Sequence, residues 1–491
     1  MKKLKRILLK VIIVAIALYL LLLFPDGKGT EVKQQAGKKT FFWNRDDEWQ
    51  LMEENFQHAK QMPPAILDSA IQILKNIAEN KLAVIEKENL AAGEDIRLTS
   101  IENNFFKLAS FIAAKPGEVN WLTDYYNRLR ICIKESSQQW NMKETAVKNY
   151  MYTLMYGLRA ATEEVLLQSD TLKISPAILV QPEKSVTRYT IIFGIEVHSG
   201  DMLVSRGGAE VSALISRGND YPGNFSHVAL IYIDTKTNTP YLIEAHIEKG
   251  VAVSSLAEYT KDKKLRFMVL RLRHDLPAMQ KDMVLPQRAA QFMYDEALSR
   301  HIPYDFKMNF YDSTALFCSE VASYAYKKER VQLWQNISTI SSVGVVNWLK
   351  DFGVENFVTQ MPSDLEYDPQ LSIVAEWRDP ETLYKDHIDN AAMDALLEKA
   401  NNGTTVGYNI WMLPVARIMK GYCWILNRFG KQGIIPEGMN ATRALKNQTF
   451  VAMHLAVKNK TAQLAAAFIK QHGYRPPYWQ LVKFAEEAAK E

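Results

Sequence analysis

Hydrophobic and polar positions divide the chain into regions with different patterns. Residues 7–24 form an apolar run that only Lys10 interrupts. From about residue 45 to residue 172, apolar residues recur at spacings of three and four, which predicts amphipathic helices. From about residue 176, short runs rich in β-branched and aromatic residues alternate with turn residues, which predicts strands.

The strand-like region also contains helical segments. Its strand-like runs are residues 188–197, 227–234, 241–247 and 265–273, and its helical runs are residues 286–299 and 318–329. This order predicts an α+β fold with an antiparallel sheet over residues 176–335. Two helical regions flank it: a domain over residues 45–172, and a mixed loop and helical region over residues 336–491.

The N-terminal apolar run has the length of a membrane span, about 20 residues. A secretory signal has a shorter apolar region and a small-residue cleavage site, so we favour an uncleaved anchor. Basic residues precede the run: Lys2, Lys3, Lys5, Arg6 and Lys10. By the positive-inside rule they keep the N-terminus cytoplasmic. The expectation is a basic tail and transmembrane helix over residues 1–28, a polar linker over residues 29–44, and a single-pass protein with its catalytic domain periplasmic or otherwise extracytoplasmic.

Composition excludes several classes of protein. The chain has 491 residues, of which 47% are hydrophobic and 23% charged, so it is not a disordered or low-complexity chain. A net charge of +4 gives no reason to expect nucleic-acid binding. The three cysteines, Cys132, Cys318 and Cys423, are too few for a disulfide scaffold and too scattered for a zinc site. No metal or organic cofactor is implied.

Three residues of the α+β region have the chemistry of a cysteine nucleophile system. Cys318 begins a predicted helix, His227 begins a predicted strand, and Glu244 lies in the next strand. A thiolate nucleophile is favoured by a helix N-terminus and by a nearby imidazole that serves as base. A third polar group can fix the tautomer and orientation of that imidazole.

Each of these residues also has an ordinary structural interpretation. A single Cys at a helix start is more often a small buried hydrophobe, and a His at a strand start is more often a turn or surface residue. His246 lies two residues after Glu244, hence on the same strand face, and competes as base or orienter. His198 and His301 also compete. Cys132 and Cys423 lie in apolar or aromatic surroundings and are expected in the core.

The order of several short motifs resembles that of the YiiX/YebB-like hydrolases. These are circularly permuted papain-like enzymes of the NlpC superfamily, related in fold to lecithin retinol acyltransferase. The resemblance covers about residues 190–330 and departs from the usual pattern at Ala229, where Gly is common. The motifs are Gly200-Asp201, Ser212 with Ile215, Ser226-His227-Val228, Glu244-Ala245, Gly250-Val251, Tyr304-Asp305 and Cys318-Ser319-Glu320.

The resemblance implies roles for individual residues. Cys318 would be the nucleophile, His227 the base and Glu244 the residue that orients the imidazole. The permuted order is present, because His227 precedes Cys318. Residues in the other motifs are expected to bind substrate or to support the site: Asp201, Ser226, Tyr304, Asp305 and Ser319.

The expected function is that of a membrane-anchored thiol hydrolase or acyltransferase. It would cleave amide or ester bonds in an acyl lipid, a lipopeptide or a peptidoglycan-type peptide of the cell envelope, through a thioacyl intermediate. The alternative is a catalytically silent papain-fold scaffold or binding protein of the envelope. The expected partners are the acyl or peptide substrate and the membrane, with no nucleic acid; the sequence identifies no protein partner.

Overall fold

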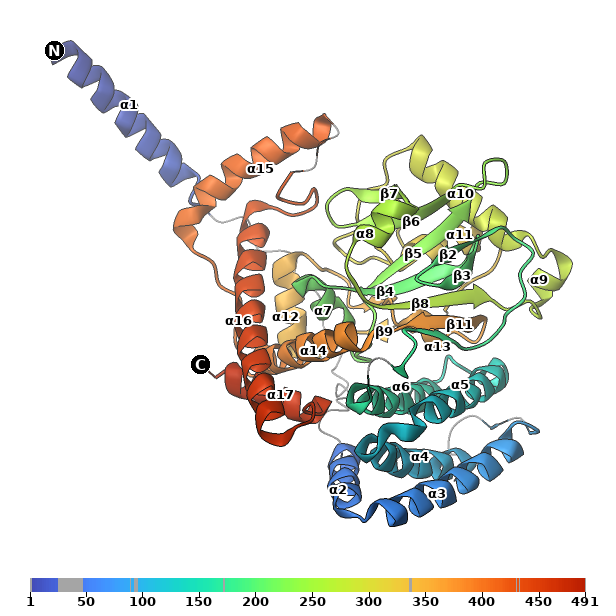
Figure 1. The fold of residues 1–491 in the computed structure, drawn as a ribbon. Helices are drawn as coiled ribbons and strands as arrows, with labels where there is room; N and C mark the ends of the chain where they lie inside the picture. The colour runs from blue at the N-terminus through green and yellow to red at the C-terminus, as the bar shows by residue number, and fades with distance from the viewer. Residues whose placement is uncertain are drawn as a thin grey trace.

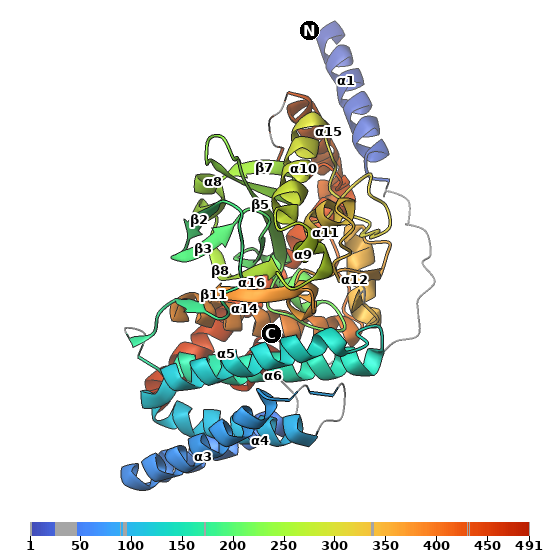
Figure 2. The same ribbon diagram turned by 90° about the vertical axis from the view of Figure 1, so that its right-hand side faces the viewer.

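The computed structural model describes residues 2–24, 47–88, 90–91, 96–170, 173–334, 338–429, 431 and 433–490. Helix α1 (Lys2–Leu21) stands away from the rest of the molecule, with its apolar side chains exposed (Figure 1, Figure 2). Among the described residues, no helix is both long and apolar enough to cross a membrane, so the predicted transmembrane helix is not confirmed. The predicted linker, residues 29–44, lies outside the described residues.

Amphipathic helices form the N-terminal domain, as the apolar spacing predicts. Pro64 begins one of them and Pro116 begins the short 3-10 turn before another, positions where the missing N–H has no intrahelical partner to lose. Their apolar faces form a core that is continuous with one face of the sheet. The helices are α2 (Asp47–Gln61), α3 (Pro64–Ile85), α4 (Ile96–Ala114), α5 (Val119–Ser136) and α6 (Thr145–Gln168).

An antiparallel sheet of seven strands forms the centre of the molecule, in the order β1-β11-β8-β4-β5-β6-β7. Its strands are β1 (Ala177–Leu179), β4 (Met202–Gly207), β5 (His227–Ile233), β6 (Pro240–His246), β7 (Gly250–Ser255), β8 (Lys264–Leu272) and β11 (Leu371–Trp377). Two separate pairs are β2 (Tyr189–Ile192) with β3 (Ile195–His198), and β9 (Ser338–Thr339) with β10 (Val358–Thr359). The mixed helical and antiparallel architecture agrees with the predicted α+β, papain-like fold class.

Strand β11 extends the sheet beyond residue 335, where the sequence analysis ended this region. It pairs with β1 on one side and with β8 on the other. The segment between residues 335 and 371 contains helices and short strands, so periodicity alone did not connect β11 with the earlier strands. The sheet therefore joins residues that are nearly 200 positions apart in the chain.

Helices and a hairpin cover the two faces of the sheet. One face packs against α10 (Leu285–Ser299), α11 (Glu320–Lys328) and the N-terminal domain. The other packs against the β2–β3 hairpin and Tyr259 of α8 (Leu256–Lys261). The remaining helices are α7 (Glu210–Arg217), α9 (Pro277–Lys281), α12 (Val343–Phe352), α13 (Asp364–Tyr367), α14 (Pro380–Asn401), α15 (Leu413–Arg428), α16 (Ala441–His472) and α17 (Tyr478–Ala488).

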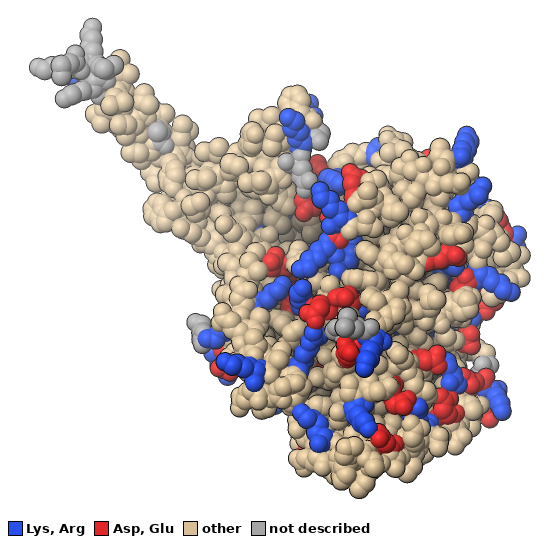
Figure 3. Space-filling model, in the orientation of Figure 1, with Lys and Arg blue, Asp and Glu red and all other residues tan. Residues whose placement is uncertain are grey.

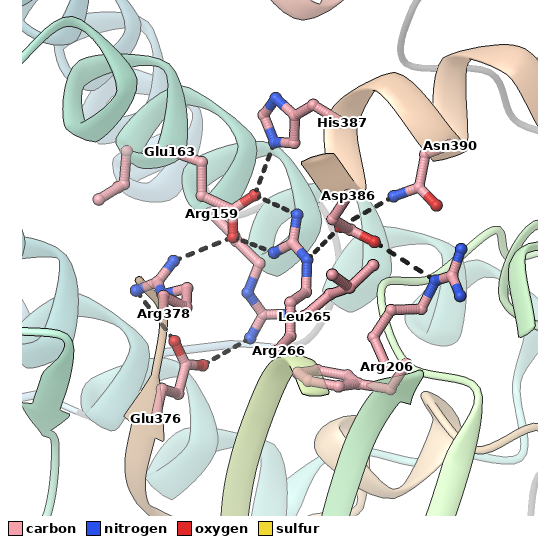
Figure 4. A network of polar contacts seen from close by, with 12 residues as sticks. Arg159, Glu163, Arg206, Leu265, Arg266, Glu376, Arg378, Asp386, His387 and Asn390 are labelled. Carbon is pink, nitrogen blue, oxygen red and sulfur yellow. Dashed lines mark hydrogen bonds and ion pairs between the residues drawn. The ribbon is translucent and has the colours of Figure 1, made fainter. Parts of the chain in front are cut away.

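A buried ionic network, here called the interdomain network, joins three parts of the fold. It connects α6 of the N-terminal domain, strands β4, β8 and β11, and α14 (Figure 4). At its centre, Glu163 accepts hydrogen bonds from Arg266 and from Arg378, at 3.0 Å in the latter case. Its members are Arg130, Arg159, Glu163, Arg206, Arg266, Glu366, Glu376, Arg378, Asp386 and Asp389.

Candidate active site

Cys318 lies in the turn immediately before α11, close to the helix start that the sequence predicts. Its side chain is buried, with 5% of the residue exposed, and its Sγ lies 3.7 Å from the carbonyl oxygen of Ser226. Ser226 directly precedes β5, so the turn before α11 meets the sheet at the start of that strand. This is the position at which a helix N-terminus favours a thiolate.

The loop before Cys318 is held against strand β7. Val251 N donates a hydrogen bond to the Ile302 carbonyl at 2.9 Å. Gly250, at the start of β7, has a positive φ of 74°, and a Cβ there would lie 2.2 Å from the same carbonyl oxygen. Only glycine allows this close approach without displacing the loop.

Strand register brings His227 and Glu244 together. Ala229 of β5 pairs with Glu244 of β6, which places His227 and Glu244 on the same face of the sheet. His227 Nε2 lies 2.8 Å from Glu244 Oε2. Because an ionised carboxylate can only accept, Nε2 carries the proton and donates it.

His227 also lies close enough to Cys318 for the two side chains to interact, so thiol, imidazole and carboxylate are neighbours in that order. Burial alone would lower the pKa of His227, but the interactions with Cys318 and Glu244 outweigh it and raise the pKa to about 9. Burial would raise the pKa of Glu244, yet the neighbouring histidines hold it well below its usual range. At neutral pH the imidazole is therefore protonated and the carboxylate ionised.

The family comparison agrees with this geometry. Residues 196–375 match the family of permuted papain-like amidase enzymes, YaeF/YiiX, C92. The match starts within β3 and ends within β11, so it includes Cys318, His227 and Glu244 and every strand of the central sheet except β1. The resemblance identified from the motifs is thereby confirmed, and residues 196–375, called the amidase domain below because of this match, are similar to the permuted papain-like amidases. None of the curated proteins compared with the chain matches it.

Two of the predicted supporting residues of the amidase domain lie beside Cys318. Ser226 provides the carbonyl that faces the thiol. Tyr304 is close enough to Cys318 for a thiolate charge to add to the effect of burial, which raises the pKa of the tyrosine.

The other three supporting residues hold the backbone around the site. Asp201 accepts hydrogen bonds from Arg271 at 2.8 Å and from His198 N at 2.7 Å, which fixes the turn before β4. Asp305 accepts from Lys307 N and Asn309 N in the loop before Cys318. Ser319 is fully buried and donates to the Gln360 carbonyl at 2.8 Å, which anchors the turn that carries the nucleophile.

Three other histidines, His246, His198 and His301, competed with His227 for the role of base, and they lie at different distances from the site. His246 is near the site: its Nε2 lies 3.5 Å from Glu244 Oε1, and its ring centroid lies 5.9 Å from that of His227. Glu244 therefore stands between two imidazoles. His198 contacts Glu196 and the Thr187 carbonyl, and His301 contacts Glu437. The geometry thus favours His227 as the imidazole partner of the thiol.

The other two cysteines are buried away from this cluster. Cys132 lies in α5 of the N-terminal domain, and burial raises the pKa of its thiol to about 11. Cys423 lies in α15, in a small apolar cluster with Ile435 and Met439. Both positions agree with their interpretation as core residues.

Sequence reasoning missed one titratable residue beside the nucleophile. Glu320 begins α11, and its carboxyl accepts a hydrogen bond from Phe317 N at 2.9 Å. Burial raises its pKa to about 9, and the nearby Asp305 adds to the effect. Glu320 is therefore neutral at pH 7 and places no negative charge next to Cys318. Its position in the Cys318-Ser319-Glu320 motif was a signal that it belongs to the site.

Proposed function

We propose that the protein is a thiol hydrolase or acyltransferase that cleaves amide or ester bonds, with Cys318 as nucleophile, His227 as base and acid, and Glu244 as the residue that orients His227. The observation that carries the proposal is the cluster of the buried Cys318 thiol, the neighbouring His227 imidazole and the Glu244 carboxylate that His227 contacts at 2.8 Å. The family match to amidases supports the bond type.

The geometry supports a two-step reaction. With the proton already on His227, the Cys318 sulfur attacks the carbonyl carbon of the substrate as a thiolate, which forms a tetrahedral intermediate. Backbone N–H groups at the start of α11 would stabilise the oxyanion. The C–N or C–O bond then breaks as His227 returns the proton to the leaving amine or alcohol. Water, or an acceptor amine or alcohol, attacks the thioester, and the thiol is regenerated.

The substrate class remains the one expected from the sequence: an acyl lipid, a lipopeptide or a peptidoglycan-type peptide. We also propose attachment to a membrane through α1, with the amidase domain on the extracytoplasmic side. The exposed apolar side chains of α1 and the basic residues that begin it support this attachment.

Alkylation of Cys318 by iodoacetamide tests the thiol–imidazole pair without a known substrate. The rate would be measured from pH 5 to pH 10 on the full chain and on His227→Ala. A free thiol is almost wholly neutral at pH 6, so rapid alkylation there requires the imidazole. We expect the rate at pH 6 to fall about tenfold or more in His227→Ala. Peptide mass spectrometry separates Cys318 from the buried Cys132 and Cys423.

Equal alkylation rates in the two proteins would instead favour a silent papain-fold scaffold. With a substrate found by screening acyl amides and esters, Cys318→Ala should lower kcat/KM by about 10³-fold or more and leave the circular dichroism spectrum unchanged. Retained turnover in Cys318→Ala would contradict the assignment of the nucleophile.

A further inference from the structure

Helix α15 has apolar side chains on two of its faces. Its inner face packs through Ala416, Met419 and Cys423 against the segment that follows it and against the start of α16. Its outer face repeats apolar residues at spacings of three and four, the period of a helix surface. This outer face is exposed along its whole length and is defined as Val415, Ile418, Tyr422 and Ile425 of α15, with Trp411 just before the helix and Phe429 just after it.

The exposure of these residues is too extensive for an ordinary surface. Ile418 is 65% exposed and Phe429 is 77% exposed, and Trp424 beside them is 60% exposed. Contiguous apolar patches of this kind mark a binding surface. Figure 3 shows few charged side chains where α1 and α15 project from the body of the molecule, in contrast to the mixed charges elsewhere on that face.

The outer face of α15 is continuous with the apolar surface of α1. Tyr19 donates a hydrogen bond to the Trp411 carbonyl at 2.5 Å, and Arg417 donates to the Leu22 carbonyl at 2.9 Å. These bonds join the C-terminal end of α1 to the N-terminal half of α15, and both ribbon views place the two helices side by side there (Figure 1, Figure 2).

Basic residues predominate around α15, although Glu437 follows it and lies near Lys420. Residues 403–436 contain no Asp or Glu, and their basic residues are Arg417, Lys420, Arg428 and Lys431. Arg428 lies over the Trp424 ring, 5.4 Å from its centroid. Aromatic residues that alternate with Arg and Lys are typical of helices in the interface of a membrane, where the basic groups meet anionic lipid.

We propose that the outer face of α15 lies in the headgroup region of an anionic lipid bilayer, parallel to its surface, beside the end of α1. Lipid fits this face better than a protein partner does, because the apolar run of α1 continues it and because basic residues predominate in the segment that carries it. This docking does not depend on the catalytic activity of Cys318.

The inner face of α15 connects the docking surface to the loop before the nucleophile. The cluster of Cys423, Ile435 and Met439 packs against Phe306, and Phe306 contacts the Tyr304 ring edge-on at 5.1 Å between centroids. A Cβ on Gly438 would lie 2.1 Å from the Phe306 ring, so the two segments are in close contact. Membrane docking would thus place the Cys318 loop near the lipid surface. This consequence, which favours lipid-linked substrates, rests on the proposed function.

A fluorescent probe on α15 tests the docking directly. The full chain would carry Cys318→Ala, to remove the reactive thiol, and Ile418→Cys labelled with an NBD group. The matched control is Leu298→Cys in the same background, since Leu298 on α10 is 63% exposed. Both proteins would be mixed with phosphatidylcholine–phosphatidylglycerol vesicles that contain lipids with brominated acyl chains.

We expect a blue shift and strong quenching of the probe at position 418, neither effect at position 298, and about tenfold weaker quenching of the 418 probe in Arg428→Glu/Lys431→Glu. Flotation of the protein with vesicles while the two probes behave alike would show that α1 binds alone, and would overturn the proposal. A blue shift at position 418 without vesicles would also overturn it and would indicate a second copy of the chain on α15. Because Cys318 is absent, the result is independent of the proposed chemistry.

Discussion

Two buried carboxylates, Glu163 and Glu244, lie at opposite faces of the same sheet and have different partners. Glu163 pairs with arginines, whereas Glu244 contacts His227. Arg206 of β4 pairs with Arg266 of β8, so both side chains point to the face where Glu163 joins the interdomain network. Ser205, the neighbour of Arg206, pairs with His227, which places His227 and Glu244 on the other face. Because successive side chains of a strand point to opposite faces, the adjacent residues Ser205 and Arg206 of β4 lie on the two faces that carry the two clusters.

The two clusters differ in whether their charged groups are available for reaction. In the interdomain network, charged side chains no more than 2% exposed face one another, as in the pairs of Arg266 with Glu163 and of Arg159 with Glu376. At the candidate active site, Glu244 is as deeply buried, but its partner His227 is 22% exposed and reaches a thiol. The first arrangement fixes the position of domains, whereas the second leaves a proton and a sulfur available for reaction.

Among the substitutions considered, removal of the charge at Glu163 should have the largest effect, and the effect should be on the free energy of unfolding. Glu163→Gln removes the anion that Arg266 and Arg378 share and leaves them only Asp386 and Glu376, and a broken buried pair costs about 3–5 kcal/mol. The free energy of unfolding in urea should fall by this amount at pH 7, and the difference between the two proteins should narrow only as the pH falls below about 4.5, because the pKa of Glu163 is lowered in the folded protein.

The adjacent Glu164 provides a matched control for Glu163. It accepts a hydrogen bond from Tyr478 N at 3.1 Å and lies 3.8 Å from His387. Burial raises its pKa to about 7, so the side chain is already partly neutral at pH 7. Glu164→Gln should therefore be much less destabilising than Glu163→Gln. Equal losses in the two variants would show that the network does not hold the domains together.

The same substitution at Glu244 should affect activity more than stability. Glu244→Gln removes the carboxylate that holds His227 Nε2, so kcat/KM should fall by about 10²-fold. The substrate would be the best acyl amide or ester from a screen, with urea unfolding measured in parallel. An unchanged kcat/KM would assign the orienting role elsewhere, and His246→Ala would then be the next variant to measure, because His246 contacts the other oxygen of Glu244.

The candidate site was more predictable from the sequence than the packing around it. Cys318 at a helix start and His227 and Glu244 in neighbouring strands follow from local patterns and from the motif order, and the structure brings all three together. His246 was a competitor on sequence grounds because it shares a strand face with Glu244, and it does lie beside that residue. Register and helix position are local properties, which explains this success.

The interdomain network could not be predicted from local patterns. Glu163 lies in an apolar helix, and its partners Arg266 and Arg378 come from strands and loops more than 100 residues later. Nothing in the sequence near Glu163 shows that the carboxylate is buried, because pairing depends on the tertiary fold. Strand β11 was missed for the same reason, since its partners β1 and β8 are both distant in the chain.

The pH dependence of kcat/KM should show whether Glu244, unlike the carboxylates of the interdomain network, supports a charge that takes part in the reaction. The pKa of His227 is raised to about 9, so the imidazolium is present below that pH and is lost as the pH rises through it. Once the imidazolium is lost, no proton is available for the leaving group, and kcat/KM should fall about tenfold per pH unit above pH 9. In Glu244→Gln this limb should move to lower pH, because the carboxylate stabilises the charged ring. If the fall of kcat/KM stays near pH 9 in that variant, the group that causes it is not His227.

Glu320 is the other group near Cys318 whose pKa is raised to about 9, and its substitution should have the smallest effect. Because the carboxyl is neutral at pH 7, Glu320→Gln replaces it with a group of similar shape and equal charge. The side-chain oxygen can still accept from Phe317 N, so the turn before α11 should persist. We expect kcat/KM at pH 7 to change by less than about threefold. The alkaline limb should remain near pH 9 if it belongs to His227. Its disappearance would instead show that ionisation of Glu320, through repulsion of the thiolate, limits the reaction at high pH.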